Sequence, residues 1–85
     1  MNTLPRLADK IEINEVEDGY IIYQSEKDRV HYLNHTAVIV LECCTGKNTV
    51  EDIERIVQKA YEMPEAPEKE VRDCLNTLFN EGLIE

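Results

Sequence analysis

The sequence predicts a single α+β domain in which a three-stranded antiparallel sheet is followed by three helices. The first third of the chain carries short runs of strand-like residues separated by turn residues. The remainder carries apolar stripes at helical spacing. The 85 residues are enough for one small domain. We assign this domain to residues 11–85 and interpret residues 1–10 as an N-terminal tail or lead-in.

The first two strands are predicted on either side of Asp18-Gly19. Ile11 and Ile13 alternate with polar residues, which is typical of a half-buried strand. Asp18-Gly19 predicts a type I′ hairpin turn, because glycine adopts positive φ without steric cost. The run at 20–23 is more uniformly apolar, as expected of a central strand.

A third strand is predicted at 29–33, after a polar turn at 25–28. Its alternation places Val30 and Tyr32 on one face and Arg29, His31 and Leu33 on the other. The strand lies at an edge of the sheet, carries one charge and contains no proline, so its edge is lightly protected. An extended peptide could add there as a further strand, unless the termini of the protein cover the edge.

The first helix is predicted at 35–44, with Asn34 as its N-cap and Gly46 as the left-handed residue that ends it. This helix is apolar nearly all round and is therefore expected to be the most buried one. Thr49 is expected to cap a second helix, with Asp52 completing a weaker capping box. The apolar stripe of that helix comprises Ile53, Ile56, Val57, Ala60 and Tyr61.

The third helix is predicted at 68–81 and ends at Gly82. Its apolar stripe comprises Val71, Cys74, Leu75, Leu78 and Phe79. Three short helices beside a small antiparallel sheet indicate a winged-helix-like arrangement, which says nothing about function by itself.

Composition excludes several function classes. The formal net charge is −9, and the chain has no run of Lys or Arg, which argues against nucleic acid or an anionic membrane as partner. No apolar run is long enough to cross a bilayer, and the first ten residues lack the apolar core of a secretory signal. The three cysteines, an odd number, agree with a reducing compartment. We therefore expect a cytoplasmic protein.

The cysteines and histidines do not form a convincing site. Cys43 and Cys44 are adjacent, so their side chains diverge on a helix and cannot easily share one metal ion. Cys44 and Cys74 could meet in the core as inert residues. His31 and His35 lie on different elements and are expected to be exposed. No motif for catalysis is present, and we predict a non-enzyme without metal or cofactor.

Three segments resemble the PqqD-like family, the recognition elements of ribosomally synthesised and post-translationally modified peptides (RiPPs). Residues 30–53, VHYLNHTAVIVLECCTGKNTVEDI, share its strand ending in Leu-Asn, its helix closing with Leu-Glu-x-Cys and a Gly, and its Thr-Val-x-x-Ile opening. Residues 75–84, LNTLFNEGLI, resemble the family's C-terminal pattern, and PRLADKIEI at 5–13 is similar to its lead-in. The resemblance covers nearly the whole chain.

The resemblance implies a domain that binds the leader of a ribosomally made precursor peptide and presents it to a modifying enzyme, often a radical S-adenosylmethionine (SAM) enzyme. The leader would add beside the third strand, in a cleft formed with the third helix. By position, the peptide-binding residues would be Arg29, Val30, His31, Tyr32 and Leu33 on the strand, and a subset of Val71, Arg72, Leu75, Asn76, Leu78 and Phe79 on the helix.

Some alternatives remain open on the sequence. Leu75 and Phe79 could equally be core residues, since the stripe must also pack against the sheet. Arg29 and Arg72 are the candidates for recognising an acidic leader. A winged-helix transcriptional regulator or another protein-interaction module is the alternative function. The open strand edge is compatible with a monomer or with a strand-mediated dimer.

Overall fold

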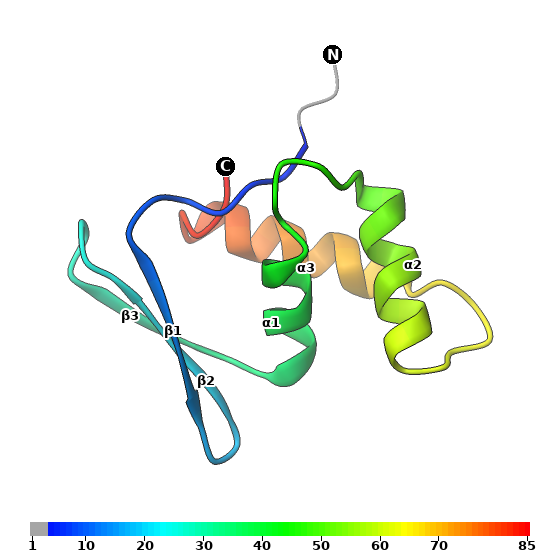
Figure 1. The fold of residues 1–85 in the computed structure, drawn as a ribbon, viewed down its shortest axis with the longest axis horizontal. Coiled ribbons are helices and arrows are strands. Elements are labelled where there is room, and N and C mark those ends of the chain that lie inside the picture. The colour runs from blue at the N-terminus through cyan, green and yellow to red at the C-terminus, as the bar shows by residue number, and fades with distance from the viewer. Residues whose placement is uncertain (1–3) are drawn as a thin grey trace.

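Three antiparallel strands and three helices follow one another in the predicted order, which confirms the α+β class (Figure 1). The computed structural model describes residues 4–85. The strands are β1 (Ile11–Val16), β2 (Gly19–Gln24) and β3 (Arg29–Leu33). The helices are α1 (His35–Glu42), α2 (Val50–Ala60) and α3 (Glu68–Asn80). The sheet order β1-β2-β3 places β2 in the centre and makes β1 and β3 its edges.

The turn between β1 and β2 differs from the prediction. Val16 pairs with Gly19, which leaves Glu17 and Asp18 as a two-residue connection without positive φ. The predicted type I′ turn is therefore wrong. Gly19 is required for another reason: a Cβ atom there would lie 2.6 Å from the Tyr32 hydroxyl oxygen and 2.7 Å from the Leu33 carbonyl oxygen. The glycine lets β3 approach β2 closely.

Helix α1 is the central helix, as predicted, and contacts β2, β3 and both other helices. Asn34 caps it, because its side-chain oxygen accepts a hydrogen bond from the Ala37 N–H at 2.9 Å. The core that surrounds α1 is almost entirely aliphatic and reaches from β2 to the C-terminal residues. Its largest fully buried side chains include Ile22, Leu41, Ile53, Leu78 and Leu83.

The capping box of α2 is confirmed. Thr49 Oγ accepts from the Asp52 N–H, and the Asp52 carboxylate accepts from the Thr49 N–H, each at 3.0 Å. These bonds hold the pKa of Asp52 below its usual value.

The predicted stripe of α2 is only partly right. Ile53 and Val57 are buried, whereas Ile56 and Tyr61 are 40% and 45% exposed. The third buried position of the helix is Glu54, at 4% exposed. A charged residue can be buried there because it is paired with α3, a contact that hydrophobic periodicity does not reveal.

The buried face of α3 is narrower than the predicted stripe. Val71, Leu75 and Leu78 are buried, but Phe79 is 62% exposed. Phe79 is thus a surface residue, although it falls at helical spacing from the core positions. Gly82, with φ of +76°, follows the helix at its C-terminal end.

The two ends of the described chain bind to each other and to the loop after α1. Leu7 N–H donates to the Cys44 carbonyl at 2.9 Å, Ala8 N–H donates to Leu83 at 3.0 Å, and Glu85 N–H donates to Arg6 at 2.7 Å. Figure 1 shows this segment crossing near the C-terminus, away from β3. The backbone of residues 4–85 therefore leaves the β3 edge uncovered. Residues 1–3 of the predicted lead-in lie outside the described residues.

Candidate functional site

The outer edge of β3 is the candidate site. Within residues 4–85, β3 pairs with β2 alone and makes no other backbone hydrogen bond along its length. In an antiparallel pair, alternate residues direct both their N–H and C=O groups away from the partner strand. These groups are thus available to an added strand.

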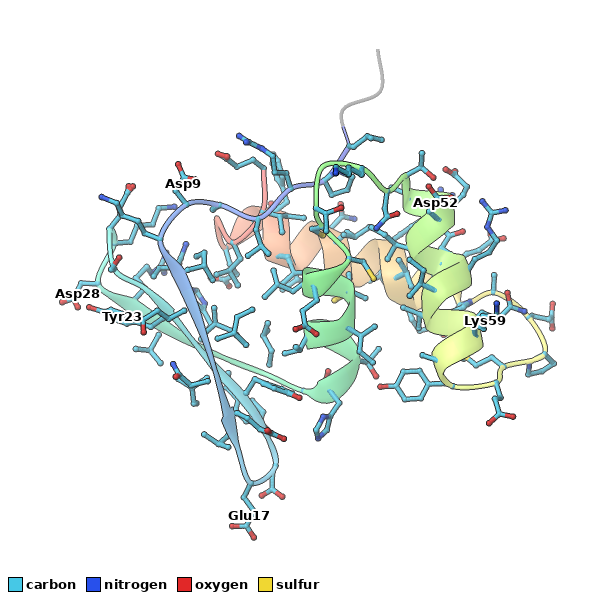
Figure 2. The ribbon with its side chains drawn as sticks, viewed as in Figure 1. Asp9, Glu17, Tyr23, Asp28, Asp52 and Lys59 are labelled. Atoms are coloured by element: carbon cyan, nitrogen blue, oxygen red, sulfur yellow. The ribbon has the colours of Figure 1, made fainter. Side chains whose placement is uncertain are left out.

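The two faces of β3 have different surroundings. Val30 and Tyr32, 62% and 56% exposed, belong to the face turned away from the helices. Tyr23, their neighbour on β2, points the same way and donates a hydrogen bond to Asp28 at 3.1 Å (Figure 2). The Tyr32 hydroxyl donates to the Asp18 carbonyl. On the opposite face, Leu33 packs partly buried against the core.

His31 does not have the exposed position that the sequence predicted. Its side chain is only 11% exposed. Nε2 lies 2.6 Å from the Gln24 Oε1 atom, and Nδ1 lies 3.6 Å from a carboxylate oxygen of Glu81. Gln24 in turn donates from Nε2 to the Gly82 carbonyl at 3.0 Å. These contacts join the inward face of the sheet to the C-terminal end of α3.

The contact to Glu81 identifies the flank of α3 that is turned toward β3. Residues four and seven positions before Glu81 lie on the same side of a helix, and these are Thr77 and Cys74. Neither was among the predicted site residues. The buried positions of α3 have a flank on each side, and nothing in the sequence says which flank faces the sheet.

Three predicted helix residues lie on the other flank. Arg72 Nε donates to a carboxylate oxygen of Glu54 at 2.9 Å, and its Nη2 atom lies 3.6 Å from a carboxylate oxygen of Glu51. Asn76 and Phe79 line a cavity of about 210 Å³, together with Pro5, Val50, Leu75, Ile84 and Glu85. Val71, Leu75 and Leu78 are core residues. The structure thus brings the five strand residues together but separates the helix set from them.

The two arginines proposed for charge recognition are in different situations. Hydrogen bonding to Glu54 raises the pKa of Arg72 and ties its guanidinium to α2. Arg29 is exposed at the start of β3, and no carboxylate of residues 4–85 lies within 4.0 Å of it. Of the two, Arg29 is the one that no carboxylate of residues 4–85 neutralises.

The cysteines have the character of core residues. Cys44 is fully buried, its thiol donates to the Val40 carbonyl, and burial raises its pKa to about 12. Burial also raises the pKa of Cys43 and of Cys74. In the part of the chain that the structure describes, no group of three His, Cys, Asp or Glu residues could hold a metal ion. No helix of residues 4–85 is long and apolar enough to cross a membrane.

Two solved structures share this fold. One is described as TbiB1 in complex with the TbiA(beta) leader peptide, with a TM-score of 0.76, 18% sequence identity, and 94% of each chain covered. The other is described as lasso peptide synthetase B1 complexed with the leader peptide, with a TM-score of 0.76 and 18% identity. It covers 96% of this chain and 98% of its own. A search of curated proteins found no match.

The family assignment comes from a match to the sequence itself. Residues 19–84, which include β2, β3 and all three helices, match the family model described as coenzyme PQQ synthesis protein D, PqqD. This agrees with the resemblance carried by residues 30–53 and 75–84. The chain belongs to the PqqD family.

Proposed function

We propose that this protein is a non-catalytic accessory protein that binds the leader of a ribosomally synthesised precursor peptide. The observation that carries the proposal is the edge of β3 that residues 4–85 leave unpaired. Family membership supports it, as do two similar structures described as complexes with a leader peptide. The expected mode is strand addition, in which main-chain hydrogen bonds supply affinity and alternate side chains supply specificity.

An added strand would have two sets of side chains. One set would lie beside Val30 and Tyr32 on the outer face, and the other would lie near His31 and Leu33 on the side of the helices. Each backbone hydrogen bond contributes only about 0.5–1.5 kcal/mol net, so side-chain contacts are also needed for stable binding. Arg29 would favour a leader with an acidic residue near that end of the strand.

The proposed partner beyond the leader is a modifying enzyme, and we propose a radical SAM enzyme. The family resemblance supports this part of the proposal, because it implies a domain that presents the precursor to such an enzyme. The cytoplasmic location and the oligomeric state, a monomer or a strand-mediated dimer, remain predictions.

The decisive experiment is an NMR titration of the ¹⁵N-labelled protein with a synthetic leader. A short precursor found among the neighbouring genes would supply the leader, and a scrambled peptide of the same composition is the control. We expect the amide signals of β3 to shift most, with changes in α3 and little change in β1. A genuine leader that leaves residues 29–33 unmoved would contradict the proposed site.

A second measurement separates this proposal from the alternative of a DNA-binding regulator. A gel-shift assay at low salt favours electrostatic binding, so a protein that binds DNA through cations should be retained there. We expect no retention, given the net charge of −9. Retention that falls steeply with salt would support the regulator instead.

A further inference from the structure

Gln24 is an unusual residue for its position. It ends the central strand on the face where Tyr20 and Ile22 pack toward the core, and it is only 3% exposed. Burying a side-chain amide without partners costs free energy that an aliphatic residue of similar size would avoid. Gln24 therefore requires its two hydrogen bonds, one to Gly82 and one to His31.

The two hydrogen bonds form a chain from His31 through Gln24 to Gly82, which we call the relay. The chemistry of the three groups determines which atom donates in each bond. The Gly82 carbonyl can only accept, so the amide nitrogen of Gln24 faces it and the amide oxygen faces His31. Because that oxygen also only accepts, His31 Nε2 carries the hydrogen in the 2.6 Å contact. Both Gln24 side-chain groups are satisfied only when β2, β3 and the end of α3 are placed as they are.

Other contacts between β3 and α3 are few. The two elements do not pack directly against each other along their length. His31 Nδ1 lies 3.6 Å from a carboxylate oxygen of Glu81, and this pair attracts only when the imidazole carries a hydrogen on both nitrogens. The hydrogen bond that joins the sheet to the end of the helix is the one from Gln24 to Gly82. Lys27, in the turn between β2 and β3, also lies across Gly82. Beside the apolar core that they share, the sheet and this end of α3 are thus joined by polar contacts with directional geometry.

We propose that Gln24 and His31 are positioning residues that hold β3 at a set distance and angle from the C-terminal end of α3. This inference rests on the proposed function, since the spacing matters for a peptide that pairs with β3 and contacts the helix. Neither residue needs to touch the peptide. The relay would act by keeping the binding edge in its peptide-ready position before the leader arrives, which reduces the ordering cost of binding.

The first test uses the free protein and needs no peptide. The ¹⁵N shifts of the His31 imidazole report which nitrogen carries the hydrogen, and we expect the Nε2–H form at pH 8. Residual dipolar couplings of amides in β3 and α3 report the angle between them. We expect this angle to change in Gln24→Leu and His31→Leu and to be retained in His31→Gln, which can still donate to Gln24.

His35 offers a control for the loss of a histidine, because it is exposed and its ring meets the edge of Tyr20 on β2 and not Gln24 or Glu81. His35→Leu should leave the couplings of β3 and α3 unchanged. The Nδ1–H form of His31 in the parent protein, or unchanged couplings in both leucine variants, would overturn the relay. The histidine shifts come from the parent protein, so this result does not depend on whether a variant folds.

The second test measures leader affinity in the same variants by calorimetry. We expect His31→Leu and Gln24→Leu to weaken binding by roughly tenfold, since each leaves a buried polar partner unsatisfied. His31→Gln should remain within about threefold of the parent. Equal affinity in the parent, Gln24→Leu, His31→Leu and His31→Gln would overturn the positioning role. Failure of the parent itself to bind a leader would contradict the proposed function, while the free-protein measurements would still decide the relay.

Discussion

The two edges of the sheet differ in how they are protected. β1 carries Glu12 and Glu15 within six residues, and Glu17 follows in the turn at the tip of the hairpin (Figure 2). β3 carries a single charge, Arg29, and exposes two large side chains, Val30 and Tyr32. Within residues 4–85 neither edge pairs with a further strand.

This difference indicates which edge is available for binding. A strand added beside β1 would meet carboxylates that it must desolvate or neutralise, and charged edge residues are a common way of preventing such pairing. A strand added beside β3 would meet mostly apolar side chains and one cation. The charges along the two edges therefore favour β3 over β1 for the proposed strand addition, and each prediction below tests part of that contrast.

The largest effect is expected from Gly19→Ala. The added Cβ would meet the Tyr32 hydroxyl and the Leu33 carbonyl, so β3 must move away from β2. We expect the free energy of unfolding to fall by about 1–3 kcal/mol, as in other overpacked sites, and leader binding to be lost. Urea denaturation and hydrogen exchange at residues 29–33 measure the two effects.

The control for Gly19→Ala is the double variant Gly19→Ala with Tyr32→Phe. Removal of the hydroxyl relieves one contact but leaves the Leu33 carbonyl, so stability should recover only in part. Parental stability and exchange rates in Gly19→Ala would show that β3 does not depend on this close approach.

Two helix caps allow a matched comparison of the β3 end with a distant site. Asn34→Ala and Thr49→Ala each remove a capping hydrogen bond and should cost about 1 kcal/mol of stability. Asn34 follows β3 directly, so only its replacement should weaken leader binding and speed amide exchange at Leu33. Equal losses of affinity would mean that binding follows global stability.

Replacing Arg29 and Arg72 one at a time should show which arginine affects leader affinity and which affects the free energy of unfolding. Arg29→Gln is expected to weaken binding of an acidic leader by about two- to fivefold, as for other exposed ion pairs, and to reduce its salt dependence. Arg72→Gln should lower the free energy of unfolding, because buried Glu54 loses its partner, and leave the salt dependence unchanged. Calorimetry at two salt concentrations distinguishes them. The reverse pattern would place the recognition cation on α3.

The smallest effect tests the protected edge. Replacement of Glu12 and Glu15 by Thr should permit weak self-association through β1, seen by sedimentation velocity as a concentration-dependent shift. Glu42→Thr with Glu65→Thr changes the net charge equally at exposed sites away from the sheet edge. Self-association in both double variants would indicate that net charge, not the β1 edge, keeps the chains apart.

Local features were readable from the sequence because neighbouring residues determine them. The Asn34 cap and the Thr49–Asp52 box depend on side chains within three positions of the backbone groups they bind. The face assignment of β3 followed from alternation alone. The prediction of the turn type at Asp18-Gly19 was wrong, because the glycine is needed where β3 approaches β2 closely. The turn preference of a dipeptide contains no information about such a contact with another strand.

The sequence predicted the strand side of the candidate site but not the flank of α3 that faces it. Periodicity located β3 and its open edge, and it placed Val71, Leu75 and Leu78 in one buried stripe. It did not show which flank of α3 faces the sheet. That choice depends on how the helix is rotated and crossed in the finished core, which many contacts decide together. The resemblance supplied Arg72, Asn76 and Phe79, which lie on the flank away from β3.

The sequence by itself determined the order of elements, the helix caps, the acidic β1 edge and the lightly charged β3 edge, because these follow from local propensity and from charge along the chain. Only the tertiary structure decided that His31 is largely buried against the end of α3, that Glu54 pairs with Arg72, and that the backbone of residues 4–85 leaves the β3 edge uncovered. These contacts join residues far apart in the chain. Their geometry exists only after the helices have packed on the sheet.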